Sequence, residues 1–252
     1  MPPQLSNNRL MASRADLRIF NTAAELFEAA AKEFVARANT AIQSSGKFTV
    51  ALSGGSTPRS LYQLLASGSI PNIPWEKIYF FFGDERNVPP EDAESNYRMA
   101  REALLYKVPE ENVFRVRAEQ DAQAAALEYE QTLRDFFKLK PAEFPRFDLV
   151  LLGLGPDGHT ASLFPDSAAL NESTKLVVAN WVEKFKTNRI TFTYPLINRA
   201  ACVVFLVAGA DKARVLHEVL DNDKAGLPSQ RVRPVEGELI WMADQAAASQ
   251  LA

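Results

Sequence analysis

The feature that most constrains how this chain can fold is a set of near-continuous apolar segments separated by stretches of helical periodicity. Four of them are KFTVALS (47–53), KIYFFFG (77–83), FDLVLLG (147–153) and CVVFLVAG (202–209). A strand that is apolar along its whole length is buried on both faces, and such strands occur in parallel sheets covered by helices. We therefore predict a doubly wound, mostly parallel α/β sheet with helices on both faces.

The remaining elements continue the alternation of strand and helix. Shorter strands are expected over 16–20, 189–194 and 238–242, with a further candidate over 175–180. Helices are expected from a capping box at Thr22 and Glu25 to Gly46, near 58–67, from about Ser95, over 120–138 and over 211–220. Residues 1–15 are predicted to be a flexible tail and residues 16–252 a single domain, because no linker or repeat divides them.

Composition narrows the classes of partner. The 252 residues carry a net charge of −3 without a basic stripe, so no nucleic-acid partner is expected. The single cysteine, Cys202, lies in an apolar run and is predicted to be a buried strand residue, and one cysteine with two histidines gives no zinc framework. No run approaches the ~20 apolar residues of a membrane span, and the first 14 residues have no signal-peptide core, so a cytoplasmic location is expected.

Four polar, glycine-bearing segments follow directly after predicted strands. They are SGGSTP (53–58), GDER (83–86), GLGPDGH (153–159) and GADK (209–212). In open parallel sheets, ligands bind outside the carboxyl ends of the strands. The four segments are therefore expected to gather at one edge of the sheet and to form a site there.

SGGSTP has the composition of an anion-binding turn. Gly54 and Gly55 allow close approach of the backbone to a ligand, and Ser56 and Thr57 supply hydroxyls at the start of the next helix. Free N–H groups at a helix start bind phosphate. The alternative is a tight strand-to-helix turn with a Ser/Thr cap; a Walker loop is excluded because no G-K-[ST] follows.

Cations elsewhere could complete an anion site. In GDER, Arg86 could face an anion while Asp84 orients it or handles protons, although a solvated charged turn would have the same sequence. Arg189 opens a predicted strand, and Lys212 follows another. Each cation alone could be a surface charge, but together with the SGGST amides they would make a strong anion pocket.

The segment LGLGPDGHTASLFP (152–165) contains G-x-G-x-x-G but lacks the context of a dinucleotide site. Pro156 interrupts the loop, and no acidic residue ends the next strand candidate. Asp157 and His159 offer instead a general base with a carboxylate to orient it, or a histidine satisfied locally in a turn. The other histidine, His217, lies in the middle of a predicted helix and is expected to be structural or solvated.

Taken in order, SGGSTP, GDER with Ser95-Asn96-Tyr97, GPDGHTASLFP, Arg189-Ile-Thr and GADK resemble the glucosamine-6-phosphate isomerase/6-phosphogluconolactonase family, and within it the lactonases. The resemblance implies hydrolysis of 6-phosphoglucono-1,5-lactone to 6-phosphogluconate in the oxidative pentose phosphate pathway, without an organic cofactor or metal. It makes the partner a small phosphosugar lactone, with a monomer slightly favoured.

The same resemblance assigns roles to the candidate residues. His159 becomes the catalytic base and Asp157 its supporting carboxylate. The SGGST loop, Arg189 and Lys212 are expected to hold the phosphate, and Arg86 to lie against the substrate at either its phosphate or its lactone end. We expect direct attack by water, because the chain has no G-x-S-x-G elbow and no plausible nucleophilic cysteine.

Two alternatives remain within related folds. Glucosamine-6-phosphate deaminases carry a Glu five residues after the histidine, where this chain has Phe164, and a Tyr where it has Arg86. Both differences favour the lactonase. Sugar-phosphate-sensing regulators carry an N-terminal DNA-binding module, for which the first 16 residues are too short.

Overall fold

The main sheet has six parallel strands. The computed structural model describes residues 16–222 and 224–251, so the predicted tail over 1–15 lies outside the described residues. The strand order is β1 (Asp16–Phe20), β9 (Glu238–Asp244), β8 (Cys202–Val207), β5 (Leu149–Leu152), β2 (Phe48–Leu52) and β3 (Ile78–Phe82). Every pairing between neighbours in this sheet is parallel, as the apolar segments predicted.

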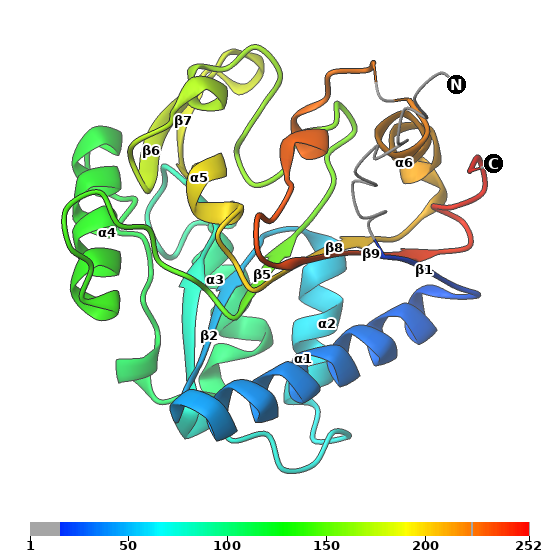
Figure 1. Ribbon diagram of the computed structural model, residues 1–252, viewed down its shortest axis with the longest axis horizontal. Coiled ribbons are helices and arrows are strands. Elements are labelled where there is room, and N and C mark those ends of the chain that lie inside the picture. The colour runs from blue at the N-terminus through cyan, green and yellow to red at the C-terminus, as the bar shows by residue number, and fades with distance from the viewer. Residues whose placement is uncertain (1–15, 223, 252) are drawn as a thin grey trace, which may run out of the picture.

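Helices cover both faces of this sheet. They are α1 (Ala23–Ser45), α2 (Ser56–Ala66), α3 (Asn96–Ala103), α4 (Ala122–Phe137), α5 (Tyr194–Ile197) and α6 (Ala213–Leu220). Figure 1 shows α1 and α2 below the sheet and α6 above it. None of the helices in the described part of the chain is both long and apolar enough to cross a membrane.

A second, antiparallel sheet stands on the main one and corrects part of the sequence prediction. It consists of β4 (Asp84–Arg86), β7 (Thr187–Phe192) and β6 (Val177–Val182), in that order. The strand expected over 189–194 therefore begins at 187 and lies outside the parallel sheet, and GDER contains a strand where a loop was expected. The connection between β6 and β7 spans only 183–186, too short for the crossover that parallel pairing requires. In Figure 1 these strands rise above the main sheet beside α4.

Helix α1 is capped nearly as its sequence predicts. The Thr22 hydroxyl accepts a hydrogen bond from the Glu25 N–H at 3.2 Å, and the Glu25 carboxylate accepts one from the Asn21 N–H at 3.0 Å. The carboxylate thus reaches one residue before the position of a standard capping box. Gly46, at φ 79°, ends the helix in the left-handed conformation that glycine adopts most easily.

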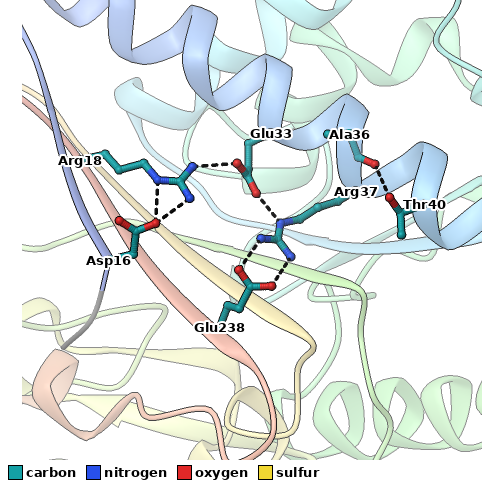
Figure 2. A network of polar contacts seen from close by, with 7 residues as sticks. All are labelled: Asp16, Arg18, Glu33, Ala36, Arg37, Thr40 and Glu238. Carbon is teal, nitrogen blue, oxygen red and sulfur yellow. Dashed lines mark hydrogen bonds and ion pairs between the residues drawn. The ribbon is translucent and has the colours of Figure 1, made fainter. Parts of the chain in front are cut away.

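A network of charges fastens the edge strand β1 to its neighbours. Arg18 pairs with Asp16 and with Glu33 of α1, and Arg37 of α1 pairs with Glu33 and with Glu238 of β9. Figure 2 shows these five side chains, the β1–α1–β9 charge network, as a continuous chain of alternating sign. The first strand, the first helix and the last strand are therefore tied together at one edge of the sheet.

Cys202 is buried in β8, as its apolar surroundings predicted. Burial raises the pKa of its thiol to about 12, so the thiolate is scarce at neutral pH. This side chain belongs to the core.

Candidate active site

The four polar segments lie at the same edge of the main sheet, as predicted. Neighbouring strands β8, β5, β2 and β3 lead into GADK, GLGPDGH, SGGST and GDER respectively. The chain passes from β2 to β3 on one side, whereas β5 lies on the other side of β2. Such a change of direction opens a crevice at the carboxyl ends of the strands, and here it lies between SGGST and GLGPDGH.

The SGGST segment places a helix start at this crevice. Gly55, at φ 103°, is the N-cap of α2 and provides no side-chain cap, so the first N–H groups of the helix stay available. Ser56 and Thr57 already belong to the first turn, because α2 begins two residues before the predicted range. A side chain on Gly54 would place its Cβ 1.9 Å from Asn96 Oδ1, so only glycine fits there.

Asp84 connects three of the segments. Its carboxylate accepts a hydrogen bond from the Ser162 hydroxyl at 2.7 Å, and its main-chain carbonyl accepts one from the Asn96 amide at 2.9 Å. The same Asn96 amide group lies against Gly54. Asp84 is buried and serves as a bridge between the strand ends, whereas its predicted contact with a substrate stays a prediction.

The next residue, Glu85, caps helix α3. Its carboxylate accepts hydrogen bonds from the N–H groups of Asn96, Tyr97 and Arg86 at 2.7, 2.8 and 2.8 Å, and from the Ser95 hydroxyl at 3.2 Å. Burial raises the pKa of Glu85 to about 7, although the N–H donors act in the opposite direction. Sequence reasoning gave Glu85 and Asn96 no role. Side-chain alternation along a strand would have placed Glu85 on the opposite face from Asp84 and Arg86.

Arg86 and Arg189 lie opposite each other in the pairing of β4 with β7. The Arg86 guanidinium donates a hydrogen bond to the Glu94 carbonyl. Arg189 is only 9% exposed, and no hydrogen bond or ion pair joins its guanidinium to any described residue. Burial, with a smaller contribution from Arg86, lowers the pKa of Arg189. A buried cation beside a second cation, with no described carboxylate in hydrogen-bond or ion-pair contact, forms a site that an anion would stabilise.

Asp157 and His159 form a pair, as expected. The His159 Nδ1 contacts Asp157 Oδ1, and Lys184 donates a hydrogen bond to Asp157 Oδ2 at 3.3 Å. The contact with His159 holds the pKa of Asp157 well below its usual range. Because the carboxylate engages Nδ1, the imidazole proton lies there and Nε2 remains a proton acceptor. The loop closes behind the ring through a hydrogen bond of 2.9 Å from the Gly155 N–H to the His159 carbonyl.

Aromatic side chains complete the surroundings of the imidazole. The Phe164 ring stacks on the His159 ring, with centroids 4.0 Å apart. Phe185, from the turn between β6 and β7, packs edge-on against Phe164 at 5.8 Å and lies 5.5 Å from the Arg189 guanidinium. Phe164 thus supports the histidine by an apolar contact.

Lys212 and His217 lie farther along the chain. Lys212 ends a short 3₁₀ turn after β8, at the same sheet edge, and pairs with Asp211 at 3.4 Å. Among the described residues, no hydrogen bond or ion pair joins it to the segments that carry Arg86 and Arg189. His217 is partly exposed on α6 and contacts Asp221 at 3.0 Å. The structure agrees with the expectation that His217 is solvated and outside the site.

Comparison with known proteins assigns the family. The family described as glucosamine-6-phosphate isomerases/6-phosphogluconolactonase matches residues 21–241. The chain belongs to this family. The match contains all of the candidate site residues, and the resemblance inferred from the sequence motifs is confirmed.

Lactonases of the family are similar to this chain in both sequence and structure. The 6-phosphogluconolactonase of a Nostoc species is 46% identical over 218 residues, covering 84% of this chain and 88% of the relative. That of a Synechocystis species is 47% identical over 220 residues, covering 85% and 89%. The structure of 6-phosphogluconolactonase from Trypanosoma cruzi superposes with a TM-score of 0.86 at 34% identity, covering 96% of this chain and 98% of that one.

A monomeric glucosamine-6-phosphate deaminase superposes with a TM-score of 0.76, covering 93% of this chain and 99% of that one, at 19% identity. At that identity the likeness is one of fold alone. The doubly wound fold is therefore shared across the family, whereas the similarity in sequence is to lactonases.

Proposed function

We propose that this protein is a 6-phosphogluconolactonase that hydrolyses 6-phospho-D-glucono-1,5-lactone to 6-phospho-D-gluconate. The observation that carries the proposal is the His159–Asp157 pair, which leaves Nε2 free as a base at the sheet edge where the α2 start also lies. The names of the lactonase relatives support the choice of substrate. Phe164 and Arg86 argue against a deaminase. The resemblance would require a Glu at the first position and a Tyr at the second, and neither side chain present can replace a carboxylate or a phenol.

The proposed reaction needs one base and no covalent intermediate. Nε2 of His159 takes a proton from water while the water oxygen bonds to C1 of the lactone. The carbonyl oxygen becomes an oxyanion, which a nearby cation or loop amide stabilises. The bond from C1 to the ring oxygen then breaks, and protonated His159 returns its proton to that oxygen. A general base of this kind contributes about 10²–10⁴-fold to the rate.

The cations of the site would hold the phosphate. Arg189 is the strongest candidate, because it is buried, no described side chain forms an ion pair with it, and an anion would offset its desolvation. The first N–H groups of α2 and Lys212 would complete the phosphate contacts, and Arg86 would lie against the sugar beside them. Remote binding of the phosphate would hold the lactone in a reactive geometry.

A direct assay with a matched variant tests the proposal. Freshly prepared 6-phosphogluconolactone is supplied to wild type and to His159→Asn, and its loss above the spontaneous rate is followed. We expect wild-type hydrolysis, with kcat reduced by about 10²-fold or more in the variant and an unchanged melting temperature. Near-normal turnover by His159→Asn would remove this residue from the mechanism. Release of ammonia from glucosamine 6-phosphate without lactone hydrolysis would overturn the function.

The cytoplasmic location and the monomeric state are parts of the proposal that rest on the sequence alone. The proposal that no cofactor is needed also rests on the sequence. Within residues 16–222 and 224–251, no group of three His, Cys, Asp or Glu side chains is placed to hold a metal ion. The proposed steps accordingly use protein side chains and water.

A further inference from the structure

The turn between β6 and β7 reaches the catalytic pair with two consecutive side chains. Lys184 donates a hydrogen bond to Asp157 Oδ2 at 3.3 Å. Phe185 packs against Phe164, the ring that stacks on His159. The turn therefore contacts the carboxylate on one side of the imidazole and the aromatic ring that covers its face.

The two oxygens of Asp157 have different partners. Oδ1 accepts from the main-chain N–H of His159 at 3.3 Å and contacts its Nδ1, whereas Oδ2 accepts from Lys184. A carboxylate held at both oxygens cannot rotate away from the imidazole. Among the described residues, Lys184 is the only cation in contact with this carboxylate besides the histidine itself.

Lys186 provides a contrast within the same turn. Its ammonium pairs with Glu183, whose carboxylate also accepts a hydrogen bond from the Trp181 indole. Lys186 and Lys184 carry the same charge and are both exposed by more than half, but only Lys184 contacts Asp157. The turn thus supplies its own control for the effect of removing one positive charge.

We infer that Lys184 is a positioning residue for the hydrolysis, acting on His159 through Asp157. The inference rests on the proposed function, in which His159 is the base. Lys184 fixes the carboxylate so that Oδ1 stays on Nδ1. Its positive charge also opposes a second positive charge on the imidazole, so its removal should change the pH dependence of the rate.

The sign of the pH effect follows from this arrangement. Asp157 attracts the proton of an imidazolium, and Lys184 repels it. Removing the ammonium therefore makes His159 easier to protonate. The acidic limb of kcat/KM should move to higher pH by about 0.3 unit, the size expected for one charge several ångströms away in a solvated site. Salt should reduce this shift, because Lys184 is half exposed.

The test compares Lys184→Met, Lys184→Arg and Lys186→Met. We expect Lys184→Met to lower kcat about 2- to 5-fold with little change in KM, which corresponds to a partly exposed ion pair. Its acidic limb should shift upward at low salt and return toward wild type in high salt. Lys184→Arg should retain wild-type behaviour, and Lys186→Met should match wild type in every measurement.

The chain has only two histidines, so nuclear magnetic resonance can follow both imidazoles separately. In Lys184→Met, the imidazole resonances of His159 should change while those of His217, on α6, stay fixed. If Lys184→Met and Lys186→Met behave alike, or if Lys184→Met raises KM alone, the inference is wrong. His159→Asn distinguishes failure of the proposed function from failure of the role of Lys184. An active His159→Asn contradicts the proposed function. An inactive His159→Asn, together with a Lys184→Met variant that keeps wild-type activity and pH dependence, contradicts only the role of Lys184.

Discussion

At the scale of single residues, the position of the His159 imidazole depends on the absence of a side chain at Gly155. A Cβ on Gly155 would lie 2.0 Å from the Nδ1 and Cε1 atoms of His159. Gly153 lies in the same loop and looks equivalent in the sequence. A Cβ on Gly153, however, would meet no described atom within 4 Å. Glycine is therefore required at position 155 to leave room for the imidazole, whereas position 153 has room for a side chain.

We predict that Gly155→Ala lowers kcat by about 10²-fold, because the methyl group pushes the imidazole about 1 Å from its position. The melting temperature should change little, since the side chain that must move, His159, is partly exposed. Gly153→Ala is the matched control and should keep its activity. Steady-state kinetics and thermal melts of both variants check this; equal losses in the two would show that the loop backbone, and not the ring seat, is sensitive.

At the scale of elements, the short strand β4 has a different task on each face. The Asp84 carboxylate accepts a hydrogen bond from Ser162, whereas Glu85 caps α3 and so fixes Asn96, which contacts Gly54. One three-residue strand thereby sets the relative positions of a helix, the SGGST turn and an arginine. A change to Glu85 should act on all of them.

We predict that Glu85→Gln alters the pH dependence of stability. The folded-state pKa of Glu85, raised to about 7 by burial, lies above its ordinary value. The ionised carboxyl therefore opposes folding, and wild type should lose stability as pH rises from about 4.5 to about 7, by at most about 3 kcal/mol. Glu85→Gln should lack this slope. Urea denaturation between these pH values measures it, and identical slopes in both proteins would contradict the assignment.

The sequence predicted the parallel strands because apolar runs such as 147–153 report burial on both faces directly. It also placed Asp157 beside His159, since only Gly158 separates them. The small sheet was missed because β4 is polar and three residues long, and a strand of that length has no periodicity to detect. Lys184 was missed because it is 27 positions after Asp157 in the sequence, and only the β6–β7 hairpin brings it back to that carboxylate.

At the scale of the whole molecule, the β1–α1–β9 charge network joins distant parts of the chain (Figure 2). Glu33 is its centre, paired with Arg18 and Arg37. Burial alone would raise the pKa of Glu33, but the two arginines lower it. Its contribution to stability is therefore present above its ordinary pKa and is lost as the pH falls through the lowered value.

We predict that Glu33→Gln lowers the free energy of unfolding by less than about 1 kcal/mol, because the network is partly exposed. The loss should shrink in about 1 M salt, which screens the charges. Glu28→Gln, at an exposed position of the same helix, is the control and should leave stability unchanged. Denaturant unfolding at two salt concentrations measures the difference. A loss that is independent of salt would assign Glu33 a packing role.

The pairing of β1 with β9 has a consequence for synthesis of the chain. Within the described main sheet, β1 is joined only to β9. A nascent chain leaving the ribosome therefore exposes β1, with its unsatisfied backbone groups, until β9 has also been translated. Of the six strands of this sheet, the one made first can pair only with the one made last. A chain that stops before residue 238 would leave this edge open to pairing with another nascent copy.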